Sequence, residues 1–238
     1  MNKVIIIGAT SGIGRELAKM YAANNWLVGA TGRRRELLDS LQKDFPDNII
    51  TECFDVAGDE NIECIKNLTQ QLGGLDLLIY NSGYGEPSKL LDWTIDKNTI
   101  QINVNGFAEI VNFIFNYFLL EGKGHIAATS SIAGIRGNSF APAYSASKAY
   151  MSTYMEGLYI KAARLKLPIY LTDIQPGFVK TKMAKGHGQF WVSAVEKAAL
   201  QIFTAIKNKK RIAYITKRWW LVAKLMRCLP MAIYKKIA

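Results

Sequence analysis

The hydrophobic positions of this 238-residue chain form short apolar runs that alternate with longer segments of helical character. A short, continuous apolar run is typical of a strand that is buried on both faces of a sheet. Strands that alternate with helices predict right-handed crossovers and a parallel sheet. We therefore predict an α/β fold, a doubly wound parallel sheet with helices on both faces. The predicted strands span residues 4–7, 26–30, 49–54, 75–79, 125–129 and 169–174.

Half of the residues are hydrophobic, which is enough for a substantial core. The length favours one domain, although it leaves two small domains open. Ten of the eleven net positive charges come from the stretch that begins at Lys207, because the rest of the chain holds 20 basic and 19 acidic residues. This distribution argues against a nucleic-acid-binding surface across the domain. The basic residues of the stretch are Lys207, Lys209, Lys210, Arg211, Lys217, Arg218, Lys224, Arg227, Lys235 and Lys236.

Few residues are available for disulfide or metal chemistry. Cys53, Cys64 and Cys228 lie far apart and outside any C-x-x-C spacing, which argues against a disulfide framework and a zinc site. Only two histidines, His125 and His187, occur in the sequence, so we expect neither a histidine-dependent triad nor a multi-histidine metal site. The N-terminus leads into a predicted strand and lacks the pattern of a signal peptide, so we expect a cytoplasmic location.

A glycine-rich turn follows the first predicted strand and opens a helix. Glycines let a backbone approach a pyrophosphate, and a helix N-terminus offers free N–H groups and a positive dipole end. A tight structural turn is the alternative, but the place of this turn between the first strand and the first helix favours dinucleotide binding. The candidate cofactor-binding residues of the turn are Gly8, Thr10, Ser11, Gly12, Ile13 and Gly14.

Arginines follow the second predicted strand, where an acidic residue would hold a ribose 2′-hydroxyl. Arg33 and Arg34 are suited to pairing with a 2′-phosphate instead. A solvated basic helix start is the alternative, but cations are unfavourable at a helix N-terminus unless an anion arrives. We therefore expect NADP(H) to be preferred over NAD(H).

Tyr144 and Lys148 are four residues apart in a predicted helix, so they share one face of it. A neighbouring ammonium favours the phenolate and is expected to lower the pKa of Tyr144 toward the working range. Tyr144 is then a candidate general acid or base, with the hydroxyl of Ser131 nearby. The pair by itself is also compatible with an ordinary helix face.

Taken together, these motifs make the sequence resemble the short-chain dehydrogenase/reductase family. The resemblance extends over nearly all of the chain up to about residue 216. The family's Asn-Asn-Ala-Gly element is altered here to Tyr80-Asn81-Ser82-Gly83, which keeps the residues needed for the turn. The resemblance implies a Rossmann-type NAD(P)-binding domain over 1–216 that includes the catalytic site, followed by a basic amphipathic extension over 217–238. It also assigns to the cofactor Asp55, Val56, Asn81, Ser82, Gly83, Tyr144, Lys148, Pro176, Gly177, Val179 and Thr181.

The resemblance implies that a carbonyl and an alcohol are interconverted by hydride transfer, with Tyr144 as the general acid or base. Ser131 would bind the carbonyl oxygen, Lys148 would tune Tyr144 and hold the ribose, and Asn103 would fix a water that relays protons. A kink-forming role for Asn103 and a structural role for Ser130 are the alternatives. The family commonly forms homodimers or homotetramers. A catalytically idle nucleotide-sensing or scaffold protein with the same fold is the second hypothesis.

The substrate side is less explicit. The family usually places a lid where residues 182–191 lie, and this segment contains both apolar and polar side chains. They line a partly apolar pocket for a small or lipid-like carbonyl or alcohol substrate, or Phe190 and Trp191 simply pack under the lid. The candidate lining residues are Met183, His187, Phe190, Trp191, Tyr84, Gly85, Ser139 and Phe140.

The C-terminal stretch has an amphipathic pattern that predicts a basic helix. Such a helix can lie peripherally on the inner membrane surface. Alternatively, its apolar stripe can pack on the domain or on another subunit, and we favour this second interpretation. It is too short and too charged to span a bilayer. The apolar stripe consists of Trp219, Val222, Met226 and Leu229, Pro230 ends the segment, and Lys217, Lys224 and Arg227 lie opposite.

Overall fold

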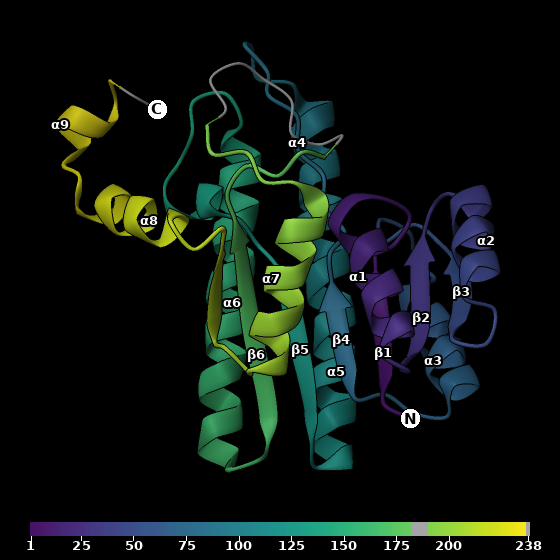
Figure 1. The fold of residues 1–238 in the computed structure, drawn as a ribbon. Coiled ribbons are helices and arrows are strands. Elements are labelled where there is room, and N and C mark those ends of the chain that lie inside the picture. The colour runs from purple at the N-terminus through teal and green to yellow at the C-terminus, as the bar shows by residue number, and fades with distance from the viewer. Residues whose placement is uncertain (182–189, 237–238) are drawn as a thin grey trace.

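The computed structural model describes residues 1–181 and 190–236 and contains a seven-stranded sheet (Figure 1). All neighbouring strands are parallel, in the order β3-β2-β1-β4-β5-β6-β7. The order reverses beside β1, as in doubly wound sheets that bind ligands at their carboxyl edge. The predicted fold is confirmed. The strands are β1 (Lys3–Ile7), β2 (Leu27–Gly32), β3 (Ile49–Cys53), β4 (Leu77–Tyr80), β5 (Gly124–Thr129), β6 (Ile169–Pro176) and β7 (Ile212–Ile215).

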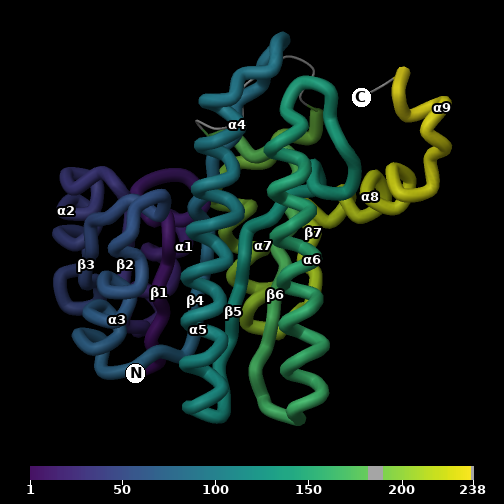
Figure 2. Tube along the Cα trace, turned by 180° about the vertical axis from the view of Figure 1, so that it is seen from behind, coloured from purple at the N-terminus to yellow at the C-terminus, as the bar shows by residue number. Residues whose placement is uncertain are grey.

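Helices cover both faces of the sheet. Helices α1, α2 and α7 pack on one face, and α3, α5 and α6 pack on the other (Figures 1 and 2). Their apolar stripes and the strands enclose two layers of core. The helices are α1 (Gly12–Ala23), α2 (Arg35–Asp44), α3 (Asn61–Leu72), α4 (Trp93–Ile100), the π-helix η1 (Gln101–Gly106), α5 (Phe107–Glu121), the 3-10 helix η2 (Ile132–Ile135), α6 (Pro142–Leu165), α7 (Val195–Lys207), α8 (Trp219–Cys228) and α9 (Met231–Tyr234).

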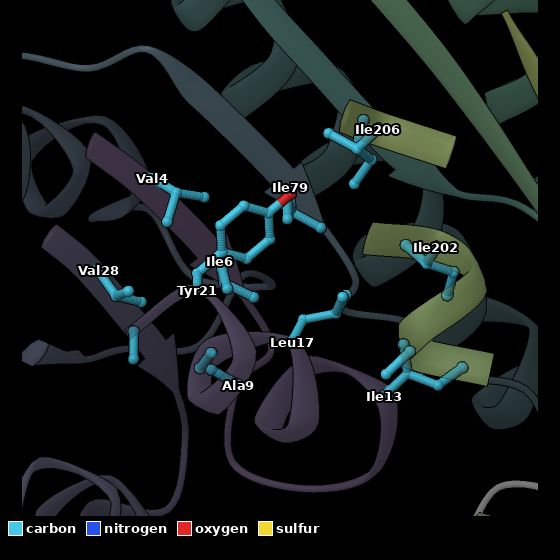
Figure 3. Close-up of a cluster of buried hydrophobic side chains, with 14 of the residues drawn as sticks. Val4, Ile6, Ala9, Ile13, Leu17, Tyr21, Val28, Ile79, Ile202 and Ile206 are labelled. Carbon is cyan, nitrogen blue, oxygen red and sulfur yellow. The ribbon is translucent and has the colours of Figure 1, made fainter. Parts of the chain in front are cut away.

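The core layer under α1 holds the glycine turn in place (Figure 3). Leu17 and Tyr21 of α1 are buried against Ile6 of β1, and Ile202 and Ile206 of α7 belong to the same cluster. Burying a side chain of this size contributes about 1.5–3 kcal/mol. The N-terminus of α1 is therefore fixed at the carboxyl edge of β1, where the sequence predicted a dinucleotide site.

All six predicted strands are present, with ends within two residues of the prediction. The seventh, β7, was not predicted. It has four residues, includes the half-buried Tyr214, and follows a basic segment, so its apolar pattern is too short to distinguish. Its pairing with β6, which sets Asp173 opposite Ile212, defines it as a strand.

Helix α8 packs on η2 and β7 through part of the predicted stripe. Trp219 is buried, whereas Val222, Met226 and Leu229 are half-buried. Packing of the stripe on the domain is therefore the arrangement observed. Of the helices in residues 1–181 and 190–236, none has the length and apolarity needed to cross a membrane.

His125 makes the stability of this fold pH-dependent. Burial, followed by the positive charge of Lys209, lowers the pKa of His125 from 6.5 to about 4. Between these values the unfolded chain binds a proton that the folded chain excludes, so the free energy of unfolding falls as the pH falls. At about 1.4 kcal/mol per pKa unit, the loss reaches roughly 3 kcal/mol near pH 4. Urea unfolding of the wild type and of His125→Gln between pH 7 and 4.5 measures this loss. If the free energy of unfolding fell equally with pH in both proteins, the assignment of the loss to His125 would be wrong.

Candidate active site

The glycine turn is tightly closed. A Cβ on Gly14 would lie 2.2 Å from the carbonyl oxygen of Gly8, and Gly8 itself has a φ of +87°. A Cβ on Gly12 would approach Thr181, which follows β6, to 3.3 Å. Asn81, after β4, donates from Nδ2 to the Gly8 carbonyl at 3.4 Å. The structure thus brings the predicted segments after β1, β4 and β6 together at one edge.

Arg34 reaches over the glycine turn. Its Nη2 donates to Thr10 Oγ1 at 2.5 Å and to Ser11 Oγ at 2.8 Å, which links the end of β2 to the N-terminus of α1. Arg33 pairs with Asp55 at 3.2 Å, with both side chains largely exposed. Asp55 also accepts from the Ala57 N–H. Both arginines are therefore at the strand end where the sequence predicted a 2′-phosphate.

Tyr144, in the first turn of α6, is seated against the loop that follows β4. A Cβ on Gly85 would lie 2.3 Å from Tyr144 Cδ2, so the ring needs a glycine there. The fully buried Asn103 holds this loop: its Oδ1 accepts from the Tyr84 N–H at 2.8 Å, and its Nδ2 donates to the Tyr84 carbonyl at 2.7 Å. Asn103 Nδ2 also donates to Ser147 Oγ at 2.9 Å. These bonds place Asn103 as a brace between η1, the loop and α6.

Ser131 caps η2 and lies beside Tyr144. Its Oγ accepts from the Ala133 N–H at 3.1 Å, and its hydrogen bond with Tyr144 lowers the pKa of the phenol. The neighbouring Ser130 is buried and donates to the Asp173 carboxylate and to the Ile174 carbonyl. Ser130 therefore occupies a structural position, while Ser131 faces Tyr144.

Burial determines the electrostatics of Tyr144. It raises the pKa of the phenol above 10, and only the Ser131 hydrogen bond opposes it. The expected depression by Lys148 is thus not present here; Lys148 Nζ lies 5.7 Å from the ring centroid and donates to the Thr129 carbonyl at 2.8 Å. Removal of the buried ammonium from water lowers the pKa of Lys148 to about 8, against the opposing effect of Asp173. Lys148 can therefore exchange a proton near neutral pH.

Asp173 on β6 is a buried carboxylate that the sequence analysis missed. Burial raises its pKa, whereas hydrogen bonds from Ser130, Gln175 and Ser152, and then the charge of Lys148, lower it. An acid inside a predicted buried strand was the available signal, because charged residues are rarely buried unless they are paired. It contributes to the wall of a cavity of about 310 Å³ between α6, β6 and β7, which Ser131 also lines.

The segment after β6, which the resemblance assigns to the cofactor, packs against the C-terminal extension. A Cβ on Gly177, which follows Pro176, would lie 2.0 Å from the Trp219 indole, and Val179 is buried and bridges to Ser193. Phe178 and Phe190 lie with their ring centroids 5.6 and 5.0 Å from that of Trp219. Trp191 completes the aromatic cluster at 5.8 Å. Phe190 and Trp191 thus pack on Trp219 and remain 49% and 43% exposed, while Met183 and His187 lie outside the described residues.

The rest of the predicted set lies around the same edge. Val56 is buried and its carbonyl accepts from Asn61 Nδ2 at 3.1 Å, while Ile13 is buried under the glycine turn. Ser82 approaches Gly8, with Gly83 next to it in the chain. Ser139 and Phe140 lie on the loop before α6, where the Phe140 carbonyl accepts from the Ser88 N–H.

The family model for short chain dehydrogenases matches residues 2–190. The chain belongs to the short-chain dehydrogenase family. It is an oxidoreductase of that family, and the Rossmann-like sheet and the carboxyl-edge site described above agree with this membership.

Among relatives of this short-chain dehydrogenase, an uncharacterized oxidoreductase of Myxococcus xanthus is 35% identical over 185 residues, which cover 75% of this chain and 72% of that protein. An uncharacterized oxidoreductase of Mycobacterium tuberculosis is 28% identical and covers 99% of this chain and 97% of its own. A short-chain dehydrogenase of Sphingobium yanoikuyae, solved with NADPH, has a similar fold, with a TM-score of 0.82, 18% identity and 98% of both chains covered. A serine dehydrogenase solved with NADP+ gives a TM-score of 0.79, at 21% identity, over 89% of this chain and 93% of its own.

Proposed function

We propose that this protein is an NADP(H)-dependent oxidoreductase that interconverts a carbonyl and an alcohol, acting on CH–OH donors in the oxidative direction. The observation that carries the proposal is the placement of Tyr144 beside Ser131, with Lys148 one turn along α6, at the strand edge that also holds the glycine turn. A general acid, an oxyanion donor and a cofactor cradle then converge on one substrate position.

In the proposed mechanism, a bound nicotinamide would supply the hydride in reduction and accept it in oxidation. Tyr144 gives its phenolic proton to the carbonyl oxygen in reduction and removes it in oxidation. Ser131 donates a hydrogen bond to the same oxygen as negative charge develops there. Lys148, with its lowered pKa, returns the proton to Tyr144 and holds the ribose hydroxyls. We assign Asn103 chiefly as a positioning residue, because its side chain is engaged by Tyr84 and Ser147; the predicted water relay toward Lys148 stays a proposal.

The proposed preference for NADP(H) rests on Arg33 and Arg34. Arg34 lies against Thr10 and Ser11 of the glycine turn, and Arg33 lies beside Asp55 at the next strand end. Two guanidinium groups at this edge favour a phosphate over a hydroxyl on the adenine ribose. Structures of relatives that hold NADPH or NADP+ support this choice by analogy.

We further propose that residues 1–216 form the catalytic domain, that the substrate is apolar or lipid-like, and that the extension 217–238 contacts a membrane surface peripherally in the cytoplasm. The aromatic cluster around Trp219 supports an apolar substrate, because it adjoins Gly177 on the nicotinamide side. A homodimer or homotetramer is proposed from membership in the family, whose members commonly associate.

A screen of carbonyls and alcohols, followed by nicotinamide absorbance, tests the activity. We expect NADPH to be consumed with at least one apolar aldehyde or ketone. NADPH binding with no turnover across a broad panel would instead favour the second hypothesis, a nucleotide-sensing or scaffold protein with this fold.

A further inference from the structure

Within residues 1–181 and 190–236, one apolar face of helix α8 packs on the domain and a second apolar face is exposed. Its inner face buries Trp219 and Ala223 against the sheet edge and η2. Its outer face presents Trp220, Leu221 and Leu225, which are 47%, 62% and 60% exposed. The outer set is distinct from the stripe that the sequence pattern singled out, and apolar residues exposed together in this way are typical of an interaction surface.

The outer face continues onto α9 and is surrounded by positive charge. Met231 and Ile233 of α9 are 63% and 51% exposed, and Lys224 Nζ lies 4.2 Å from the centroid of the Trp220 ring. No acidic residue follows Glu196 in the sequence. The exposed basic residues of 217–236 are Lys217, Arg218, Lys224, Arg227, Lys235 and Lys236; of these, Arg218 also lies over the Trp191 ring, and Arg227 also lines the cavity that Asp173 lines.

Arg136 clamps this unit to the rim of the active site. Its Nη1 donates to the carbonyls of Met226 and Leu229, and its guanidinium lies 4.3 Å from the centroid of the Tyr234 ring. The buried Tyr234 donates from its hydroxyl to the Gly137 carbonyl at 2.8 Å. The clamped loop joins η2, which Ser131 caps, to α6, which carries Tyr144.

The position of α9 fits entry of a substrate from one side of the molecule. In both Figure 1 and Figure 2, α9 lies toward the end of the molecule where the strands terminate, which is the end that carries the site. Phe140, on the clamped loop, is 56% exposed and adds apolar surface to the rim.

We propose that α8 and α9 dock on an anionic lipid bilayer, and that Arg136 ties the docked unit to the active-site rim so that the substrate enters from the lipid phase. The first part deepens the peripheral membrane contact proposed above, and the second part rests on the proposed oxidoreductase activity. An exposed set of Trp and Leu among Lys and Arg matches the composition of helices that lie in a membrane interface. A second copy is a poorer occupant, because a two-fold contact through this face would oppose two acid-free basic surfaces.

Vesicle sedimentation of the full-length protein tests the docking surface. We expect the protein to pellet with phosphatidylglycerol vesicles, to stay in the supernatant with phosphatidylcholine vesicles, and to be released by high salt. Combining Trp220→Ser, Leu221→Ser and Leu225→Ser should weaken vesicle binding at least about tenfold. Lys224→Glu should weaken it about fivefold or more, since each basic residue near the surface contributes about 1 kcal/mol.

Matched controls keep the surface test specific. Leu120→Ser changes an 89% exposed apolar residue at the C-terminal end of α5, and Lys210→Glu changes an exposed lysine before β7. Both controls should bind vesicles as the wild type does. Equal losses of vesicle binding in the controls and in the α8 variants would overturn the proposed docking surface. It would also be overturned if the wild type did not bind anionic vesicles, or if the only change in the triple variant were a smaller oligomer in sedimentation velocity.

The Arg136 clamp is tested by the ratio of kcat/KM for a long-chain aldehyde in phosphatidylglycerol vesicles to kcat/KM for a short, water-soluble aldehyde. Arg136→Ala should bind vesicles as the wild type does and lower this ratio at least about fivefold, because the docked helices no longer align the rim. An unchanged ratio would overturn the coupling. Vesicle binding requires no turnover, so a failure to reduce any aldehyde would count against the proposed function and leave the docking result standing.

Discussion

Replacing Tyr144 with Phe is expected to lower kcat about a thousandfold and to leave NADPH binding largely unchanged. A positioned general acid contributes roughly 10²–10⁴-fold to a rate, and the phenolic hydroxyl is the group placed to donate here. Phe keeps the ring that packs on Gly85, so the loop after β4 and its brace by Asn103 should stay in place. Steady-state turnover measured by nicotinamide absorbance, with NADPH affinity measured by calorimetry, separates chemistry from binding.

Tyr150→Phe is the matched control for this variant. Tyr150 is on the same helix, is 38% exposed, and stacks on Tyr154 with the ring centroids 5.7 Å apart. It should retain wild-type turnover. If Tyr144→Phe also kept wild-type turnover, the general-acid assignment would be wrong. A loss of NADPH affinity as large as the loss of kcat would instead indicate that the hydroxyl supports cofactor binding.

Replacing both Arg33 and Arg34 with Ala is expected to weaken NADPH binding about 100-fold and to change NADH affinity little. A hydrogen bond to a charged group contributes about 1.5–3 kcal/mol, and the double variant removes two such donors from the 2′-phosphate. Arg34 should account for most of the loss, because it lies across the glycine turn, whereas Arg33 is more exposed and already pairs with Asp55.

Lys43→Ala, which removes an exposed charge from the last turn of α2, controls for the change in net charge. Fluorescence titration of both cofactors against the wild type, the double variant and Lys43→Ala gives the six dissociation constants that are needed. Equal losses for NADPH and NADH in the double variant would refute contact with the 2′-phosphate. An equal loss of NADPH affinity in Lys43→Ala would attribute the effect to long-range charge alone.

The sequence predicted the parts of this site that depend on local pattern. Six strands followed from apolar runs, and the glycine turn followed from spacing alone, because a tight turn between a strand and a helix needs glycines at set positions. Arg33 and Arg34 were identified by their place after β2, since the carboxyl ends of parallel strands share one edge. Strand β7 was missed because an apolar run of four residues next to a basic segment is too short to be distinguished as a strand.

Contacts between residues far apart in the chain could not be predicted from local pattern. Asn103 was assigned from resemblance, but its bonds to Tyr84 and Ser147 join segments 19 and 44 residues away. The lowering of the Tyr144 pKa that the neighbouring Lys148 predicted is absent, because helical spacing says nothing of how much water remains around a phenol. The charge of Asp173 affects the pKa of Lys148 only because the tertiary fold packs β6 against α6.

By itself, the sequence determined the order of strands and helices along the chain, the glycine turn and the Tyr144–Lys148 pair, because these depend on residues within a few turns of one another. The tertiary structure alone decided that Gly85 receives the Tyr144 ring, that Trp219 closes on Gly177, and that Trp220, Leu221 and Leu225 are left outside. An amphipathic pattern ranks the faces of a helix by polarity. Whether a face is buried depends on which other elements pack against it, and those contacts join residues that are far apart in the chain.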